Sequence, residues 1–467
     1  MAKTKEIYVC KECGYESSKW MGQCPACHAW NTLEEKAPVL STEQTQYAHV
    51  KVSEGLRQLK KVSVQSSDRI VTQMKELNRV LGGGLVRDSI SIIAARPGAG
   101  KSTLLLQTAQ DVASAGYRVL YVSGEESESQ LRRRAARILK DIHENIWVHS
   151  TSHMNEVLSA IEATDPALII LDSIQTFFLD EYSSRPGSPT QILECTNVIM
   201  KLAKNPAHPR AVLMAGQLTK EDELAGVRAL EHMVDTVLYM EADPAEELRT
   251  LSATKNRFGS TGEMGFFTME ENGLQAIDNP SQYFMTKRDP EADITGSALS
   301  VIKEGTRPMI AEVETLISQS FTPYPSRIAE CMKRDQLATL ISILEQRGGI
   351  ALYDKNVVVK STGGLKLNQQ SVNLAVIMSL VSSALKKSIP ADTVFIGDVG
   401  LTGELKKVPS LEMMIREIVR MGFSRIFVPP DSLKAEGKKK LSQVEVIETR
   451  NLTQVIRQVF GDYRKKF

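Results

Sequence analysis

Residues 94–103, "AARPGAGKST", decide the fold of this chain. They fit the pattern G-x4-G-K-[ST] with Gly100, Lys101 and Ser102, while Ala95 stands at the position of the first glycine. A segment with strand character precedes the loop and a helical pattern follows it, which is the context of a phosphate-binding loop. The alanine requires only that this position needs no positive φ. The sequence therefore predicts that the chain binds ATP.

The loop predicts contacts with the phosphates of the nucleotide and with its magnesium ion. Its backbone N–H groups would surround the phosphates at the start of a helix. Lys101 would reach the β and γ oxygens, and Ser102 would ligate Mg²⁺. The residues expected to bind ATP here are Ala95, Arg96, Pro97, Gly98, Ala99, Gly100, Lys101, Ser102 and Thr103.

Two further polar residues follow apolar strand patterns. Asp172 closes "LIILD" (168–172), and we expect its carboxylate to hold the magnesium shell. Gln217 follows "AVLMAG" (211–216) and is a candidate sensor of the γ-phosphate. The alternative for Gln217 is an ordinary loop amide.

The segment "SGEES" (123–127) supplies two candidate general bases, Glu125 and Glu126. A carboxylate beside the phosphate loop would orient and deprotonate the attacking water. Glu126 is slightly preferred. It has an alternative role as a charge at a helix start, because Ser127 and Gln130 have the spacing of a capping box.

Short β-branched runs alternate with helical patterns from residue 70 to residue 278, which predicts an α/β fold with a mostly parallel, covered sheet. The expected strands are 89–95, 118–123, 167–172, 211–216, 235–240 and 249–255. A second α/β unit follows, marked by the long apolar helix pattern "QQSVNLAVIMSLVSSAL" (369–385).

Four of the six cysteines lie within the first 27 residues. Two C-x2-C pairs separated by ten residues are typical of two knuckles around one tetrahedral Zn²⁺, and an iron–sulfur cluster is a minor alternative. The predicted zinc ligands are Cys10, Cys13, Cys24 and Cys27. Four thiolates close the coordination shell, so a structural role is expected. Cys195 and Cys331 are expected in the core.

Composition and charge exclude several classes of protein. The net charge is +1, so a nucleic-acid surface would have to be a local patch. The N-terminus lacks the apolar region of a secretory signal, and there is no apolar run of 18 residues. We therefore expect a cytoplasmic protein that does not contact a membrane.

Motifs along the whole chain resemble the bacterial RadA (Sms) family of DNA repair and recombination proteins. The resemblance is carried by the cysteine pairs and by "LGGGLV", "GAGKSTLLLQ", "YVSGEES", "LDSIQT", "SSRPGSPTQ", "LTKEDELAG", "LEHMVDTVLYMEAD", "KNRFG" and "EGTRPMIAEVE". It implies a RecA-like P-loop ATPase core, an N-terminal four-cysteine zinc finger and a C-terminal Lon-protease-like α/β domain. The implied boundaries are a zinc finger at 1–36, a linker at 37–66, the ATPase domain at 67–278, a linker at 279–299 and the Lon-like domain at 300–467.

The resemblance also implies an activity and partners. The family resembled contains DNA-dependent ATPases that form hexameric rings. They act in homologous recombination beside the RecA recombinase, on single-stranded and branched DNA, by branch migration or helicase-like translocation. Arg185 and Lys220 lie in loops expected to face the DNA, whereas the basic runs 131–137 and 434–440 are read as solvated surfaces.

The segment "KNRFG" (255–259) is the signature of the family resembled. The resemblance implies that Lys255 and Arg257 reach the nucleotide bound by a neighbouring subunit and act there as catalytic cations. An added cation at the γ-phosphate accelerates phosphoryl transfer about 10³–10⁵-fold in other enzymes. Strand alternation would turn Asn256 the opposite way. The alternative is a solvated strand end with two free cations.

The C-terminal part resembles the proteolytic domain of Lon, which uses a serine nucleophile activated by a lysine. Ser371 stands at the position of the serine, but Glu412 stands at the position of the lysine. A carboxylate cannot replace the amine of such a dyad, so no peptidase activity is expected. Two rivals remain open from the sequence: an ATP-dependent Lon-like protease and an ATP-regulated adaptor that loads RecA.

Overall fold

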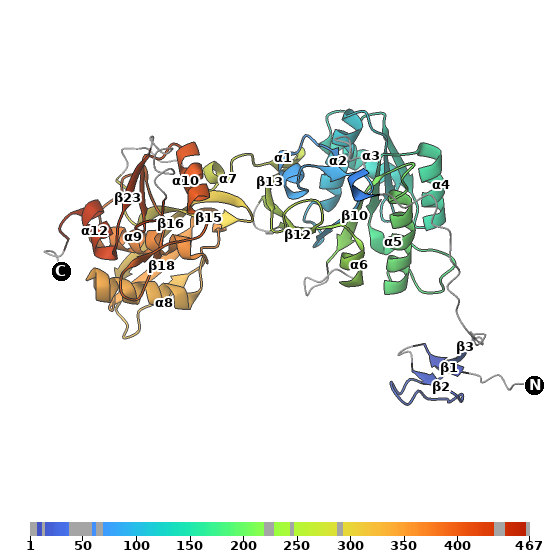
Figure 1. The fold of residues 1–467 in the computed structure, drawn as a ribbon, viewed down its shortest axis with the longest axis horizontal. Coiled ribbons are helices and arrows are strands. Elements are labelled where there is room, and N and C mark those ends of the chain that lie inside the picture. The colour runs from blue at the N-terminus through green and yellow to red at the C-terminus, as the bar shows by residue number, and fades with distance from the viewer. Residues whose placement is uncertain are drawn as a thin grey trace, which may run out of the picture. The chain divides into compact units, whose positions relative to one another are not determined.

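The computed structural model describes residues 7–11, 15–36, 58–61, 69–218, 228–242, 247–286, 293–433 and 444–463 (Figure 1). The chain separates into two compact units, Met1–Gln65 and Ser66–Phe467. The first unit holds a three-stranded antiparallel sheet in the order β2 (Glu16–Ser17), β1 (Ile7–Cys10), β3 (Leu33–Lys36). Its buried cluster consists of Cys10, Cys24 and Leu33. So small an apolar core favours a metal as the main source of stability.

A nine-stranded sheet forms the first half of the second unit. Its order is β14-β13-β12-β11-β6-β10-β9-β7-β8. The strands from β11 to β8 are parallel, and β12, β13 and β14 extend the sheet antiparallel. The parallel strands are β6 (Ile90–Ala95), β7 (Val119–Ser123), β8 (Ile146–Ser150), β9 (Leu168–Asp172), β10 (Ala211–Gln217) and β11 (Thr236–Ala242). The antiparallel strands are β12 (Leu248–Asn256), β13 (Met264–Glu270) and β14 (Gly273–Ala276).

Helices cover both faces of this sheet (Figure 1). α1 (Lys75–Val80), α2 (Lys101–Ser114) and α3 (Glu128–Ile138) pack on one face, where Ile93, Tyr121 and Ile170 are buried. α4 (Met154–Thr164), α5 (Pro189–Ala203) and α6 (Arg228–Met233) pack on the other, against the alternate strand residues. A parallel sheet buried on both faces confirms the predicted α/β ATPase fold.

The six predicted strands are present within about two residues at each end, as expected for strands marked by buried β-branched runs. Three strands of the same sheet were missed. None of the five residues of β8 is fully buried, and Trp147 and Val148 are 52% and 42% exposed, so the strand lacks the buried apolar run that marks the others. β13 and β14 form a hairpin at the end of the sheet order, and six of their eleven residues are half-buried or exposed. The small pair β4 (Arg69–Ile70) and β5 (Leu85–Val86) lies outside the large sheet.

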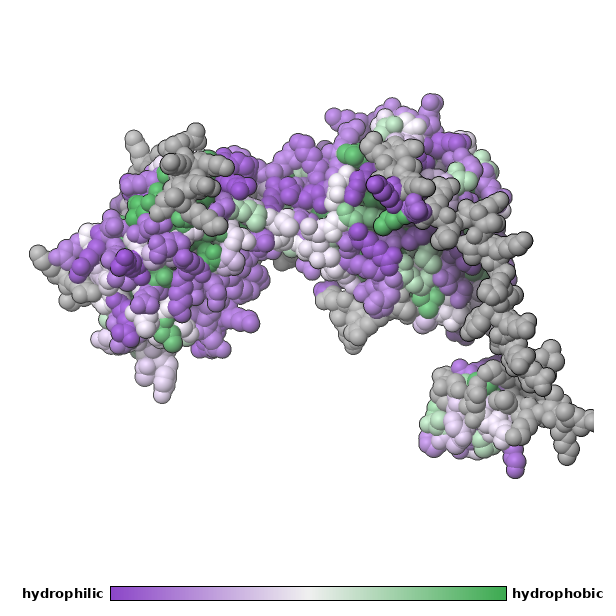
Figure 2. Space-filling model, viewed as in Figure 1, coloured by the Kyte–Doolittle hydropathy of each residue, from purple (hydrophilic) through white to green (hydrophobic). Residues whose placement is uncertain are grey.

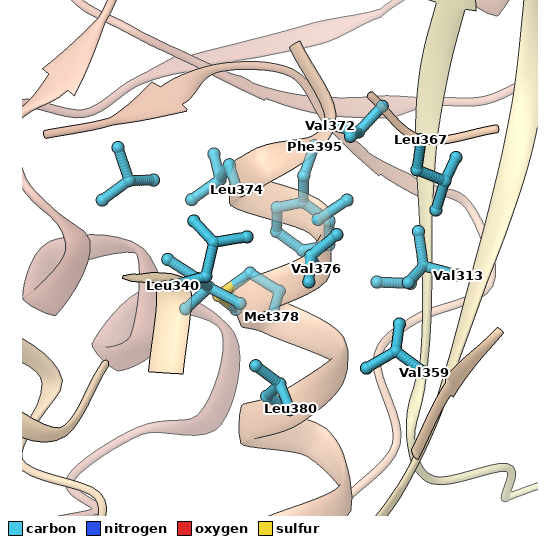
Figure 3. Packing of buried hydrophobic residues seen from close by; sticks show 14 of the residues in the cluster. Val313, Leu340, Val359, Leu367, Val372, Leu374, Val376, Met378, Leu380 and Phe395 are labelled. Atoms are coloured by element: carbon cyan, nitrogen blue, oxygen red, sulfur yellow. The ribbon is translucent and has the colours of Figure 1, made fainter. Parts of the chain in front are cut away.

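A seven-stranded mixed sheet organises residues after 296, in the order β17-β18-β16-β15-β19-β22-β23. Its strands are β15 (Ser297–Glu304), β16 (Arg307–Gln319), β17 (Arg327–Ala329), β18 (Lys355–Ser361), β19 (Thr393–Phe395), β22 (Arg425–Val428) and β23 (Glu445–Glu448). The buried helix α9 (Asn373–Leu385) packs on one face with α8 (Arg334–Ile343) and α12 (Leu452–Phe460). Figure 3 shows Leu374, Val376 and Leu380 of α9 in this cluster. α10 (Leu411–Arg420) packs on the other face. The likeness of this part to Lon and the domain boundaries stay predictions.

Hydrophobic and hydrophilic residues are mixed over the face drawn in Figure 2, and the hydrophobic ones occur in small groups. Within the described ranges, no helix combines the length and the apolar character needed to cross a bilayer.

Candidate nucleotide site

The phosphate loop connects the end of β6 with the start of α2, in the middle of the parallel sheet. Ala95 is the last residue of β6, so it has extended backbone and needs no glycine. Gly98 and Gly100 have φ values of 81° and 111°, which favour glycine. A Cβ at Gly100 would also lie 2.6 Å from Cε of Met269. These two glycines therefore allow the turn that brings N–H groups to the start of α2.

A hollow of about 410 Å³ lies over the loop. It brings together predicted residues from four strand ends: the loop after β6, Glu125 after β7, Asp172 at the end of β9 and Gln217 at the end of β10. The residues that line it are Pro97, Gly98, Gly100, Lys101, Ser102, Thr103, Glu125, Arg134, Arg137, Asp172, Gln217 and Met269. Arg96 and Ala99 line an adjoining hollow of about 610 Å³ with Pro97 and Gly98. Such a hollow suits a nucleotide and its metal.

Lys101 lies at the centre of the site. Its Nζ donates a hydrogen bond to the carbonyl of Ala95 at 3.1 Å. Burial lowers the pKa of Lys101, and the nearby charges of Asp172 and Glu125 oppose this effect. Bound phosphate oxygens would add further negative charge and favour the protonated amine.

Asp172 is held by a tyrosine that the sequence analysis missed. Tyr121, on β7, donates from its hydroxyl to Oδ2 of Asp172 at 2.6 Å, and both residues are buried. Burial raises the pKa of Tyr121 well above its ordinary value, and the charge of Asp172 raises it further. The tyrosine therefore stays a donor. It fixes one carboxylate oxygen, and the other would be available to the water shell of Mg²⁺.

Glu125 has its carboxylate in the hollow. Its Oε1 accepts hydrogen bonds from Ser173 Oγ at 2.6 Å and from Gln217 Nε2 at 3.0 Å. The hydroxyl of Ser123 accepts the backbone N–H groups of Glu125 and Glu126 at 3.2 and 2.9 Å. This turn sends the two adjacent carboxylates in different directions.

Glu126 does not line the hollow; it forms an ion pair with Arg134 on α3. Its other oxygen, Oε2, is buried and has no hydrogen-bond partner within the described part of the chain. The predicted capping box is present directly after Glu126, because the side chains of Ser127 and Gln130 each accept the other's backbone N–H. Glu126 is therefore tied to the start of α3.

The basic run 131–137 was read as a solvated surface, and three of its four arginines, Arg132, Arg133 and Arg137, are exposed, whereas Arg134 is half-buried. Arg134 and Arg137, one turn apart on α3, line the hollow, whereas Arg132 and Arg133 do not. A period of three to four residues could have separated the two pairs, because positions i and i+3 share a helix face.

Lys255 and Arg257 lie beside the amino ends of the parallel strands, whereas the hollow lies at their carboxyl ends. β12 runs antiparallel to β11, so Asn256 pairs with Thr236 at the start of β11. Thr236 pairs with Ser91, near the start of β6, whereas the phosphate loop follows the end of β6. A strand rises about 3.3 Å per residue, so the two cations are separated from the loop by about 15 Å of strand. The structure does not bring them to the nucleotide site of their own chain.

Both cations have partners at that edge. Arg257 Nη1 lies 3.0 Å from Oδ1 of Asp235, which also binds Lys204 at 3.1 Å. Lys255 Nζ donates to the carbonyl of Glu231 at 2.7 Å. Partial burial lowers the pKa of Lys255, and the charge of Arg257 lowers it further. Asp235 itself is buried, and its presence here was not predicted.

Asn256 points away from the two cations, as strand alternation predicts. It is 8% exposed, and its Nδ2 donates to the carbonyl of Val80 at 3.2 Å. Its Oδ1 accepts the backbone N–H of Phe258 at 2.9 Å, which shapes the turn. The asparagine thus anchors the segment while its neighbours stay at the surface.

The metal site of the first unit has three described ligands. The sulfur atoms of Cys10, Cys24 and Cys27 lie within 4.8 Å of one another, and Cys10 Sγ is 3.7 Å from Cys27 Sγ. These spacings fit thiolates arranged around one tetrahedral Zn²⁺. The fourth predicted ligand, Cys13, lies outside the described residues.

Ser371 is enclosed, and the hydrogen bond described for its hydroxyl goes to a backbone carbonyl. It is 4% exposed, and its hydroxyl donates to the carbonyl of Val301 at 3.1 Å. Glu412 is exposed on the first turn of α10. A hydroxyl enclosed in this way contributes to packing at the start of α9.

One predicted DNA-facing loop is described and the other is not. Arg185 is exposed in the segment between residues 177 and 188. The buried amide of Gln191 ties this segment down, because its Nε2 bonds the carbonyls of Leu179, Tyr182 and Ser184 at 2.9–3.0 Å. Lys220 and the basic run 434–440 lie outside the described residues.

A phosphate loop at the carboxyl edge of a covered parallel sheet, together with a cysteine ribbon, defines a zinc-containing P-loop ATPase of the RecA-like class. Residues 56–222 match the family model described as an AAA domain, and residues 8–35 match the rubredoxin metal binding domain. The chain belongs to the RadA family. It is 40% identical to the DNA repair protein RadA of Bacillus subtilis (strain 168), over 99% of this chain and 100% of the relative. The proteins of the same name from Halalkalibacterium halodurans and Listeria monocytogenes serovar 1/2a are 39% and 37% identical, with the same coverage of both chains.

Proposed function

We propose that this chain is a DNA-dependent ATPase of DNA repair and homologous recombination, and that it completes each ATP site with cations from an adjacent copy. The observation that carries the proposal is the position of Lys255 and Arg257. They lie at the sheet edge remote from their own phosphate loop, and neither is among the described residues that line its hollow.

In this proposal, Lys101 and the N–H groups of the loop bind the β- and γ-phosphates. Asp172, oriented by Tyr121, and Ser102 would hold Mg²⁺, which would supply positive charge to neutralise the charge that develops during phosphoryl transfer. Glu125 is the general base. It is the glutamate whose carboxylate lies in the hollow, and Gln217 would connect it to the γ-phosphate.

A neighbour's cation explains why two basic residues would be placed on a strand end far from the loop. A head-to-tail interface joins two different surfaces of identical chains, and such interfaces form a ring where the rotation between copies closes. The edge that holds Lys255 and Arg257 would then face the carboxyl edge of the next copy. Arg257 would leave Asp235 for the γ-phosphate. Hydrolysis would depend on assembly, in a ring that we propose to be hexameric.

The DNA-linked part of the proposal rests on family membership and on the names of the relatives. We propose branch migration or helicase-like translocation on single-stranded and branched DNA, beside RecA. Arg185 is exposed on a segment that Gln191 braces, which suits a fixed contact with a phosphate backbone. The protease rival lacks support from Ser371, which is enclosed. The adaptor rival predicts DNA binding without duplex displacement.

The test mixes two inactive variants. Lys101→Ala should abolish hydrolysis, and Arg257→Ala should bind ATP but lose DNA-stimulated hydrolysis. In a random 1:1 ring of the two, about a quarter of the head-to-tail interfaces join an intact loop to an intact arginine. ATPase activity with single-stranded DNA should therefore return in the mixture.

The control is Arg133→Ala, which removes an exposed arginine from α3 and should leave the activity unchanged. The molecular mass in solution should show the ring for each variant. An assembled mixture that stays as inactive as its parents would refute action between copies.

A further inference from the structure

The geometry points to Arg307 as a positioning residue for the segment Lys255–Gly259. It would act through the short helix α1, and we infer that it links the seven-stranded sheet to the ATP site of the neighbouring copy. This inference rests on the proposed function, since it gives a further residue for the same reaction.

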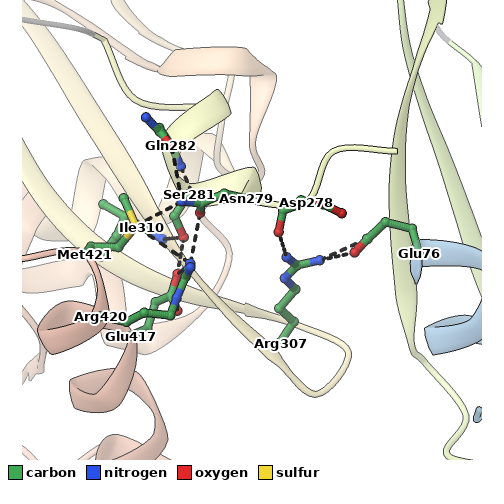
Figure 4. Close-up of polar contacts among 10 residues, drawn as sticks. All are labelled: Glu76, Asp278, Asn279, Ser281, Gln282, Arg307, Ile310, Glu417, Arg420 and Met421. Atoms are coloured by element: carbon green, nitrogen blue, oxygen red, sulfur yellow. Dashed lines mark hydrogen bonds and ion pairs between the residues drawn. The ribbon is translucent and has the colours of Figure 1, made fainter. Parts of the chain in front are cut away.

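Arg307 begins β16 and reaches out of the seven-stranded sheet to α1 (Figure 4). Its Nη1 lies 2.8 and 2.9 Å from the two carboxylate oxygens of Glu76, and its Nη2 donates to the carbonyl of Asp278 at 2.8 Å. The side chains of Arg307 and Glu76 are 12% and 3% exposed. Glu76 also accepts the backbone N–H of Phe266 at 3.1 Å and lies 3.7 Å from Arg79. Removal of Arg307 would still take the ionic partner of both oxygens from a buried carboxylate, so the pair helps to fix the position of α1.

β15 and β16 form a hairpin, and the turn of this hairpin makes a second close contact with the nine-stranded sheet. Gly305, in the turn between β15 and β16, has a φ of 62°, and a Cβ there would lie 1.9 Å from the carbonyl oxygen of Gly262. Thr306 donates a hydrogen bond from its hydroxyl to Glu263. Both partners lie in the connection between β12 and β13. The hairpin turn therefore packs against the connection that follows β12, the strand that carries Lys255 and Asn256.

The other end of α1 holds the cationic segment. Val80, the last residue of α1, accepts the hydrogen bond from Asn256. The backbones of Gly82 and Gly259 touch, because a Cβ on either would lie 2.8 Å from the Cα of the other. Helix rise is about 1.5 Å per residue, so Glu76 and Val80 are about 6 Å apart along the axis. One helical turn thus separates the Arg307 contact from the Asn256 contact.

Arg69 completes this support. Its Nη1 donates to the carbonyl of Gly82 at 2.8 Å, and its Nη2 donates to the carbonyl of Phe258 at 2.9 Å. Arg257 lies between Asn256 and Phe258, so its backbone is held on both sides while its side chain is exposed. A shift of α1 would move both anchors together and displace the guanidinium that serves the neighbouring site.

The test places Arg307→Met in one or the other partner of the mixed ring. In the mixture described above, the Lys101→Ala copy donates the arginine and the Arg257→Ala copy binds the ATP. Arg307→Met added to the donating copy should lower the restored, DNA-stimulated kcat about tenfold, a size usual for coupling through packed elements, with little change in KM. Arg307→Met added to the ATP-binding copy should leave the restored rate near that of the mixture in which both copies keep Arg307.

The matched control is Arg425→Met, which breaks the exposed pair of Arg425 and Glu445 in the same sheet and should lower neither rate. Equal losses in both arrangements would show a general structural effect and would overturn the inference, as would no loss in the donating copy. If the mixture in which both copies keep Arg307 shows no restored activity, the proposed function is refuted instead. Where Arg307→Met does not fold, Arg307→Lys replaces it, with the same contrast expected between the two arrangements.

Discussion

Gln217 donates a hydrogen bond from Nε2 to Oε1 of Glu125 at 3.0 Å, so the ends of β10 and β7 meet at one oxygen atom. These strands are not neighbours, because β9 lies between them. The residue after β9, Ser173, donates to the same oxygen at 2.6 Å. Three strand ends therefore orient this carboxylate, whereas the adjacent Glu126 turns away to Arg134.

This arrangement predicts different results for the two glutamates. Glu125→Gln should lower the rate of ATP hydrolysis about 10²–10⁴-fold, which is the usual contribution of a general base, and should keep ATP binding. Glu126→Gln is the matched variant and should retain most of the turnover, since its carboxylate faces α3. Steady-state ATPase rates and nucleotide binding check this. An inactive Glu126→Gln beside an active Glu125→Gln would reverse the assignment.

The lowered pKa of Lys101 predicts a pH effect on the stability of the nucleotide-free protein. Between the lowered pKa of the folded state and the ordinary value of about 10.4, the unfolded chain binds more protons at this residue. Its unfavourable contribution is therefore complete at low pH and is relieved as the pH rises through this window.

Lys101→Met removes this contribution. The thermal unfolding midpoint of the variant, relative to that of the native chain, should be highest near neutral pH, and the difference should shrink as the pH approaches 10. A difference that does not depend on pH would contradict the burial of the amine.

The thiols should fall into two classes when zinc is removed. Burial raises the pKa of Cys195 to about 12 and that of Cys331 to about 11, so neither should react with a thiol reagent while the fold persists. A strong chelator should release one Zn²⁺ per chain and expose the four cysteines of the first 27 residues to the reagent. Peptide mapping of the labelled sites, with Cys24→Ala as a zinc-free control, gives the result. Labelling of Cys195 before chelation would contradict the predicted protection of the buried thiols.

Ser371 should affect stability and not proteolysis. Ser371→Ala removes a buried hydrogen bond to Val301 and should lower stability by about 1 kcal/mol. Ser342→Ala, which removes an exposed hydroxyl from α8, should cost less. Neither the native chain nor the variants should hydrolyse casein. ATP-dependent casein hydrolysis that is lost in Ser371→Ala would restore the protease reading.

Much of the nucleotide site was predictable, because local spacing encodes it. The loop pattern placed Lys101 and Ser102 at the start of a helix, and an aspartate after an apolar run marked the end of a buried strand. Tyr121 and Asp235 had no such signal. Each looks like an ordinary strand residue, and its role depends on a partner more than 50 residues away or on charges from two other elements.

The sequence by itself determined the phosphate loop, the alternation of strands and helices and the paired cysteines, since these depend on neighbours within a few residues. Only the tertiary structure decided which of two adjacent glutamates lines the hollow over the phosphate loop and at which ends of the strands Lys255 and Arg257 lie. The order and direction of strands set those positions. Both depend on which distant segments pair to bury their apolar faces, a choice that the residues of one segment do not contain.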